Sequence, residues 1–160
     1  MIIALYGASC TGKSTIANSL IASHHLPIRR CGDEVRSMSA ARNLQPERLP
    51  LDAHREIDAL SVAWVREHAT RAAIIEGRFL DSVLSPVTDL IKLSQVSAAP
   101  DIRAERWEVR RPGIVGQAEV ARQDAADEAF RTWAYSEMTR SVANMNVETD
   151  REDRAWDHLL

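Results

Sequence analysis

The sequence predicts a three-layer α/β/α fold, in which helices cover both faces of a parallel β-sheet. Three observations support this prediction. Short apolar segments alternate with amphipathic ones, a glycine-rich loop joins the first strand to the first helix, and no linker, repeat or low-complexity tract divides the 160 residues. Strands that alternate with helices build parallel sheets with both faces covered. We therefore expect one domain over residues 1–160.

The first strand is expected over residues 1–6, which are apolar and rich in strand-forming residues. A loop with the spacing Gly-x-x-x-x-Gly-Lys-Ser begins at Gly7 and leads into a helix over 13–23. Such a turn directs backbone N–H groups and the positive end of the helix dipole at one point, where polyphosphate binds. Lys13 is then expected on the β- and γ-phosphates of ATP, and the Ser14 hydroxyl on Mg²⁺. The expected nucleotide-binding residues of the loop are Gly7, Ala8, Ser9, Cys10, Thr11, Gly12, Lys13, Ser14 and Thr15.

Apolar periodicity predicts the next elements in order. A short strand over 26–30 precedes a helix over about 33–43. A longer amphipathic helix is expected over Leu51–His68, because its apolar residues recur at spacings of three and four. Two strands, over 72–75 and 89–93, follow that helix.

The C-terminal third is predicted to be mainly helical. Pro100 opens an arginine-rich helix that ends at Pro112, and a second helix runs from Gly116 to about residue 140. A last strand over 144–149 and a closing helix over 151–159 complete the pattern. The residues expected on one side of the second helix are Ala126, Ala129, Phe130 and Trp133.

Charged residues follow the second and third predicted strands, where ligands of parallel sheets bind. Asp33 and Arg36 follow the second strand, and Glu76 and Arg78 follow the third. Arginine suits a two-point grip on phosphate or carboxylate. Acidic groups beside a nucleotide hold Mg²⁺ or orient an acceptor hydroxyl. We expect Glu76 to share the Mg²⁺ site with Ser14.

Three arginines recur on one face of the predicted helix that begins at Pro100. Arg103, Arg106 and Arg110 are spaced i, i+3, i+7, and their charges repel unless an anion or acidic neighbours neutralise them. This spacing predicts a short helical lid over about 101–120 that closes over the transferring phosphates. The alternative is a surface helix held by salt bridges to its interspersed glutamates.

The composition excludes several classes of protein. A net charge of −3 and a pI near 6.0 argue against a general nucleic-acid binder or a polybasic membrane anchor. No apolar run is long enough to span a bilayer, and no signal-peptide pattern is present. Two cysteines provide neither a disulfide framework nor a metal cluster. We expect a cytoplasmic monomer or homodimer that acts on a small-molecule phosphate acceptor, without nucleic-acid or membrane partners.

The motifs together resemble those of the cytidylate kinases, best those of the short archaeal-type branch. The resemblance spans most of the chain and rests on the loop, CGDEVR at 31–36, REID at 55–58, IIEGR at 74–78 and RAER at 103–106. It implies a nucleoside monophosphate kinase fold with a five-stranded parallel core, acceptor-binding helices over about 33–69, and an arginine lid. It also implies that Arg106 and Arg110 cover the phosphates of ATP and that Thr149 lies near adenine.

On the acceptor side the resemblance implies that Arg36 and Arg78 grip the acceptor's phosphate and that Asp33 lies near its sugar or base. Cytidylate kinases carry further arginines on the helix after the lid, and Arg122 takes one such place. The following segment, 124–129, is acidic and small where more arginine is expected. Each lost charge-assisted pair costs about 1.5–3 kcal/mol of affinity for a phosphate group.

Three functions follow from this sequence. The leading one is transfer of the γ-phosphoryl group of ATP to a nucleoside monophosphate, with CMP or dCMP as the expected acceptor. Such an acceptor is already ionised, so no general base is required. In the second, the acceptor is a hydroxyl of a small metabolite or antibiotic, and Asp33 becomes the general base. The third is a nucleotide-binding regulator without catalysis.

Overall fold

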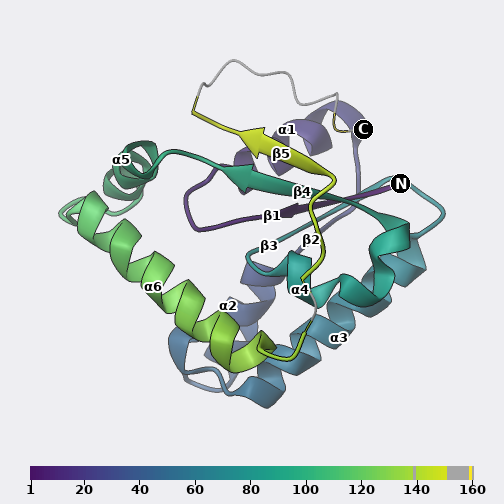
Figure 1. The fold of residues 1–160 in the computed structure, drawn as a ribbon, viewed down its shortest axis with the longest axis horizontal. Helices are drawn as coiled ribbons and strands as arrows, with labels where there is room; N and C mark the ends of the chain where they lie inside the picture. Colours follow the sequence, from purple (N-terminus) through teal and green to yellow (C-terminus); the bar gives the residue numbers. More distant parts are fainter. Residues whose placement is uncertain (139, 151–158, 160) are drawn as a thin grey trace.

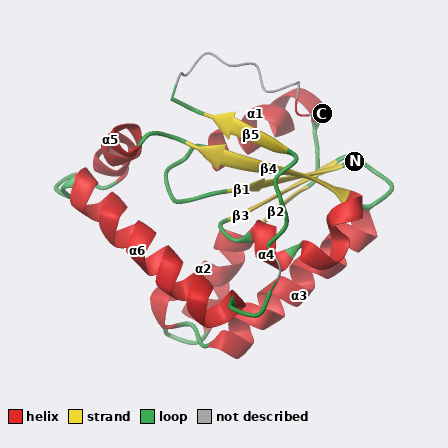
Figure 2. Cartoon of the chain, in the orientation of Figure 1, coloured by secondary structure: helices red, strands yellow, loops and turns green. Residues whose placement is uncertain are grey.

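The computed structural model has a parallel five-stranded sheet at its centre and helices on both of its faces (Figures 1 and 2). It describes residues 1–138, 140–150 and 159. The strands lie in the order β2-β3-β1-β4-β5, and every neighbouring pair is parallel. The predicted α/β fold is confirmed. The strands are β1 (Ile2–Tyr6), β2 (Ile28–Arg30), β3 (Ala73–Gly77), β4 (Ile91–Ser97) and β5 (Met145–Glu148).

The two faces of the sheet carry separate apolar clusters, because successive side chains of a strand point to opposite faces. Ile3 of β1 packs in one cluster with Ile16 of α1, whereas Ile2 packs in the other with Val65 of α3. No helix in the described part of the chain is long and apolar enough to cross a membrane. The α-helices are α1 (Lys13–His24), α2 (Cys31–Ala41), α3 (Leu51–His68), α4 (Leu80–Val83), α5 (Pro100–Arg110) and α6 (Gly116–Tyr135), and the 3₁₀ turns are η1 (Pro46–Arg48) and η2 (Ser85–Leu90).

The fourth strand is longer and later than the predicted 89–93. The turn η2 occupies the residues up to Leu90, so β4 begins at Ile91 and continues to Ser97. Polar residues in the strand hid this extension from the apolar pattern. Ser94 is fully buried beside β1, and Gln95 accepts a hydrogen bond from the Tyr6 hydroxyl.

Helix α6 differs from its prediction in length and in orientation. It ends at Tyr135 instead of about residue 140. Ala126 and Ala129, expected on its packed side, are exposed, and the Trp133 side chain is 53% exposed. The helix predicted over 151–159 lies outside the described residues apart from Leu159, which is buried in the cluster on the α1 face. The side chains that α6 directs at the rest of the protein are Asp124, Asp127, Arg131 and Tyr135.

Candidate active site

The loop between β1 and α1 has a backbone that requires glycine at two positions. Gly7 has φ +143° and Gly12 has φ +92°. A Cβ at Gly7 would lie 2.2 Å from the Val96 carbonyl oxygen, so a larger residue would displace the loop from β4. Thr11 Oγ1 donates a hydrogen bond to the Ala8 carbonyl and closes the turn. The loop thus presents the free N–H groups of the first turn of α1 to a ligand.

The Lys13 side chain folds back across this loop. Its Nζ donates hydrogen bonds to the carbonyl oxygens of Gly7 at 2.8 Å and Ala8 at 2.6 Å. Burial lowers the Lys13 pKa to about 8, and the nearby Glu76 carboxylate opposes that shift. The buried ammonium group therefore lacks a full negative partner, which a polyphosphate would supply.

Ser14 and Glu76 meet beside the loop, although 62 positions separate them in sequence. Ser14 Oγ donates to Glu76 Oε1 at 3.0 Å, and the buried Glu76 Oε2 accepts no hydrogen bond within the described residues. Among those residues no group of three or more His, Cys, Asp or Glu could hold a metal. A hydroxyl and one carboxylate fit Mg²⁺, which takes few protein ligands and completes its shell with water and phosphate.

Arg103 ties the loop to both α5 and α6. Its Nε donates to the Ser9 carbonyl at 3.0 Å, and its two terminal nitrogens donate to the Asp124 carboxylate at 3.0 and 2.6 Å. The arginine side chain is only 7% exposed. This two-point pair neutralises one of the three arginines on the predicted face of α5.

Arg106 lies beside the same loop but uses its donors on backbone and on Thr149. It donates to the Cys10 carbonyl at 3.3 Å and to Thr149 Oγ1 at 3.0 Å, and Thr149 in turn donates to the Thr11 carbonyl. The Arg110 guanidinium lies 5.9 Å from the centre of the Trp107 ring. Both arginines, together with Lys13, oppose the rise that burial causes in the Cys10 pKa. The predicted arginine face therefore does lie at the loop.

The acceptor side centres on Arg78, which follows β3 directly. Its Nη1 donates to Asp127 Oδ1 of α6 at 2.6 Å. Phe79 stacks on Phe130 with ring centres 5.1 Å apart, and His54 of α3 meets the same Phe130 ring at 4.7 Å. Burial, reinforced by the Arg78 charge, lowers the His54 pKa. These side chains form an aromatic wall around one ion pair.

The other predicted acceptor residues lie apart from this pair. Arg36 pairs with Asp33 on α2, where both side chains are more than half exposed. Arg122 pairs with Glu119 one turn away on α6, and its side chain is 56% exposed. In the described residues neither pair bonds to the loop or to Arg78.

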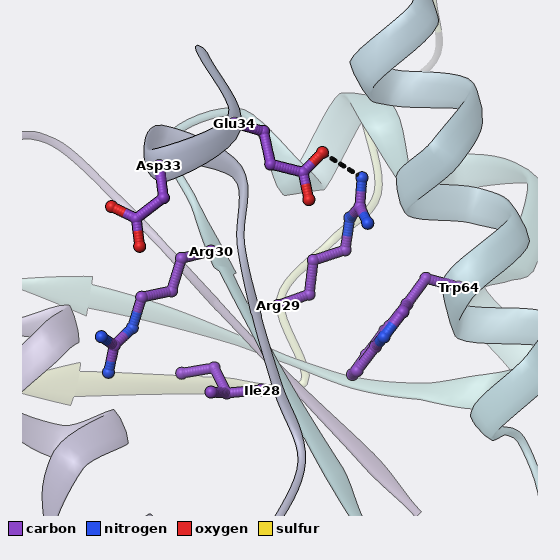
Figure 3. A pocket seen from close by; sticks show the side chains of 6 residues that line it. All are labelled: Ile28, Arg29, Arg30, Asp33, Glu34 and Trp64. Atoms are coloured by element: carbon purple, nitrogen blue, oxygen red, sulfur yellow. Dashed lines mark hydrogen bonds and ion pairs between the residues drawn. The ribbon is translucent and has the colours of Figure 1, made fainter. Parts of the chain in front are cut away.

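Asp33 also borders a hollow of about 280 Å³ along β2, the edge strand of the sheet (Figure 3). Figure 3 shows the Arg29 guanidinium directed at Glu34, with Trp64 of α3 as the facing wall. Arg29 also donates to Ser61 of α3. The charges inside this hollow are thus largely matched by one another.

A polar stripe on α6 carries functional candidates that the apolar pattern missed. Arg131 donates to the Asp81 carboxylate of α4 at 2.9 and 3.2 Å, and the Tyr135 hydroxyl donates to Asp58 of α3 at 2.9 Å. Burial raises the Asp58 pKa to about 6. The spacing of three, four and four between the polar residues of this stripe was the available signal. The stripe consists of Asp124, Asp127, Arg131 and Tyr135.

Solved structures of kinases share this architecture. A putative kinase from Chloroflexus aurantiacus J-10-fl superposes with a TM-score of 0.58 at 17% identity, over 99% of this chain and 93% of its own. The shikimate kinase of Bacteroides thetaiotaomicron gives 0.60 at 14%, over 98% and 90%. The gluconokinase of Sinorhizobium meliloti 1021 gives 0.57 at 14%, over 98% and 85%. No protein-family model and no curated protein matches the chain. At these identities the likeness is one of fold, and it confirms the predicted kinase-type α/β architecture.

Proposed function

We propose that this chain is an ATP-dependent phosphotransferase that moves the γ-phosphoryl group to a small molecule. The observation that carries the proposal is the loop at β1, with its two positive-φ glycines and the buried Lys13 ammonium group across it. A backbone cradle with one lysine holds the β- and γ-phosphates in kinases and other nucleotide hydrolases. The fold shared with three kinases supports the same conclusion.

Magnesium and ATP would be held by residues already near one another. Ser14 and Glu76 would hold the ion, directly or through water, and the ion would neutralise charge on the phosphates. Lys13 would stabilise the charge that spreads over the transferring group. Arg106 and Thr149, which bond to each other beside the loop, are the proposed neighbours of the adenine.

Two acceptor classes compete for the other half of the site. Arg36 and Arg78 favour a nucleoside monophosphate, with CMP or dCMP as proposed acceptors. Each of these arginines, however, already holds a carboxylate, namely Asp33 or Asp127. A dianionic phosphate would have to break these pairs and face the freed carboxylates. We therefore favour a hydroxyl acceptor on a small metabolite, and keep nucleoside monophosphates as the second candidate.

A screen of ATP consumption against both acceptor classes tests the proposal. The phosphate arm contains CMP, dCMP and UMP, and the hydroxyl arm contains shikimate, gluconate and an aminoglycoside. Turnover in the hydroxyl arm alone supports the favoured acceptor class, and turnover with CMP or dCMP establishes the second. ATP binding without transfer to any compound would indicate a regulator. Calorimetry that detects no Mg-ATP binding would overturn the whole proposal.

A further inference from the structure

Helix α6 passes the phosphate-binding loop and then the acceptor side, and its polar stripe records this path. Asp124 is held by Arg103, which also bonds to the Ser9 carbonyl of the loop. Asp127 follows three positions later, and residues three apart on a helix lie on the same face. Asp127 is thus the next side chain along α6 from the loop toward the acceptor helices.

Asp127 is well enclosed, with a side chain that is 15% exposed. Its Oδ1 accepts the hydrogen bond from Arg78, while no residue of the described chain donates to its Oδ2. The positive charges of Arg78 and Lys13 both act on this carboxylate, although burial still raises its pKa. Asp127 therefore shares one site with the lysine of the loop and keeps one oxygen free to accept a proton.

The aromatic wall of Phe79, Phe130 and His54 surrounds the Arg78–Asp127 pair. Such rings limit the access of water and strengthen electrostatic interactions inside. The positive charge of Arg78 is already balanced by its carboxylate partner. The space next to the loop therefore suits an uncharged hydroxyl compound better than a dianion.

We propose that Asp127 binds the acceptor hydroxyl and accepts its proton, and that the acceptor is an uncharged polyol or amino alcohol at this position. This assignment rests on the proposed phosphotransferase function. The acceptor oxygen forms a bond to the γ-phosphorus of ATP, and the bond from that phosphorus to the β–γ bridging oxygen breaks. The electron pair of the broken bond stays with ADP, and the hydroxyl proton passes to the free Asp127 Oδ2. Arg78 holds the carboxylate in place through Oδ1.

The assignment replaces Asp33 as the general base expected from the sequence. Asp33 is bound to Arg36 on an exposed part of α2, next to the hollow along β2. Asp127 instead lies against Arg78, two residues after the proposed magnesium ligand Glu76.

The test compares Asp127→Asn with Asp33→Asn and with Glu128→Gln, an exposed neighbour on α6. The readouts are the Mg-ATP Kd, kcat with the hydroxyl acceptor from the screen, and acceptor-free ATP hydrolysis, in which water replaces the acceptor. Asp127→Asn should lower kcat by about 10²–10⁴-fold and flatten its rise with pH, since the base is gone. Its Mg-ATP Kd should stay within about threefold, and Asp127→Glu should restore part of kcat.

Two results would overturn the assignment while the proposed function stands. One is full kcat in Asp127→Asn together with lost kcat in Asp33→Asn, which would return the base to α2. The other is a wild-type enzyme that uses CMP or dCMP and no hydroxyl compound. A wild-type chain that binds no Mg-ATP, or that neither transfers nor hydrolyses its γ-phosphoryl group, would overturn the proposed function as well.

Discussion

The nucleotide side and the acceptor side of this protein are built in different ways. The nucleotide side consists of consecutive residues, 7–15, whose backbone conformation positions the donors. The acceptor side consists of side chains from distant segments, such as Arg78 and Asp127, which lie 49 positions apart. Consecutive residues fix their own geometry, whereas distant residues meet only through packing. A specific phosphate site can therefore be read from a short motif, and an acceptor site cannot.

The two sides also differ in how their charges are matched. At the loop, the Lys13 ammonium group rests on neutral carbonyl oxygens and has its pKa lowered by burial. On the acceptor side, Arg78 and Arg36 each hold a carboxylate. The loop thus awaits an anion, while the acceptor side is balanced without one. This difference is the physical basis for assigning phosphate to the first side and a hydroxyl to the second.

The largest expected effect belongs to Lys13→Ala, which removes the single cation of the loop. We expect kcat to fall by about 10²–10³-fold, because a preorganised donor to the transferring group is lost. Steady-state kinetics with saturating ATP would measure it. Lys92→Ala removes the only other lysine and should change kcat little. Equal turnover in Lys13→Ala and wild type would break the comparison at its stronger half.

The sequence predicted the elements whose signals are local. Helix α3 has the bounds that its apolar spacing predicted, Leu51–His68, and the loop has the expected glycine geometry. Strand β4 was misplaced because Ser94 and Gln95 are buried or bonded within the sheet, which an apolar pattern cannot register.

The orientation of α6 was wrong for a related reason. Its apolar residues include an exposed Trp133, and its inward face is held by ion pairs and hydrogen bonds to partners far away in sequence. The acidic segment 124–129 was noticed as a departure from the cytidylate kinase pattern. Its partners, Arg103 and Arg78, became identifiable only once the helices were packed.

A smaller effect is expected from Glu76→Gln, which keeps the shape of the side chain but removes its charge. Activity should fall by about 10–100-fold at limiting Mg²⁺, as when support of a metal site is weakened. Excess Mg²⁺ should restore part of the loss, and titration of activity against the ion concentration measures it. Glu67→Gln, on an exposed part of α3, is the matched control. An unchanged magnesium requirement in Glu76→Gln would contradict the proposed metal site.

The smallest effect concerns stability on the acceptor side, where Asp58 of α3 accepts the Tyr135 hydroxyl of α6. Burial raises the Asp58 pKa to about 6, above its ordinary value of 3.8. Between these values the folded chain holds a proton that the unfolded chain has released. The free energy of unfolding therefore falls as the pH rises through this window, and levels off above about pH 6.

Asp58→Asn should remove that fall, because the amide stays uncharged and still accepts the Tyr135 hydrogen bond. We expect the variant to be more stable than wild type by about 1–2 kcal/mol at pH 7 and to match it near pH 4. Urea unfolding at several pH values measures the difference, with the exposed Asp89→Asn as control. A pH-independent difference would mean that shape complementarity, and not the buried charge, joins α6 to α3. The acceptor side would then be assembled by packing alone, and its ion pairs would be free to rearrange around an anionic acceptor.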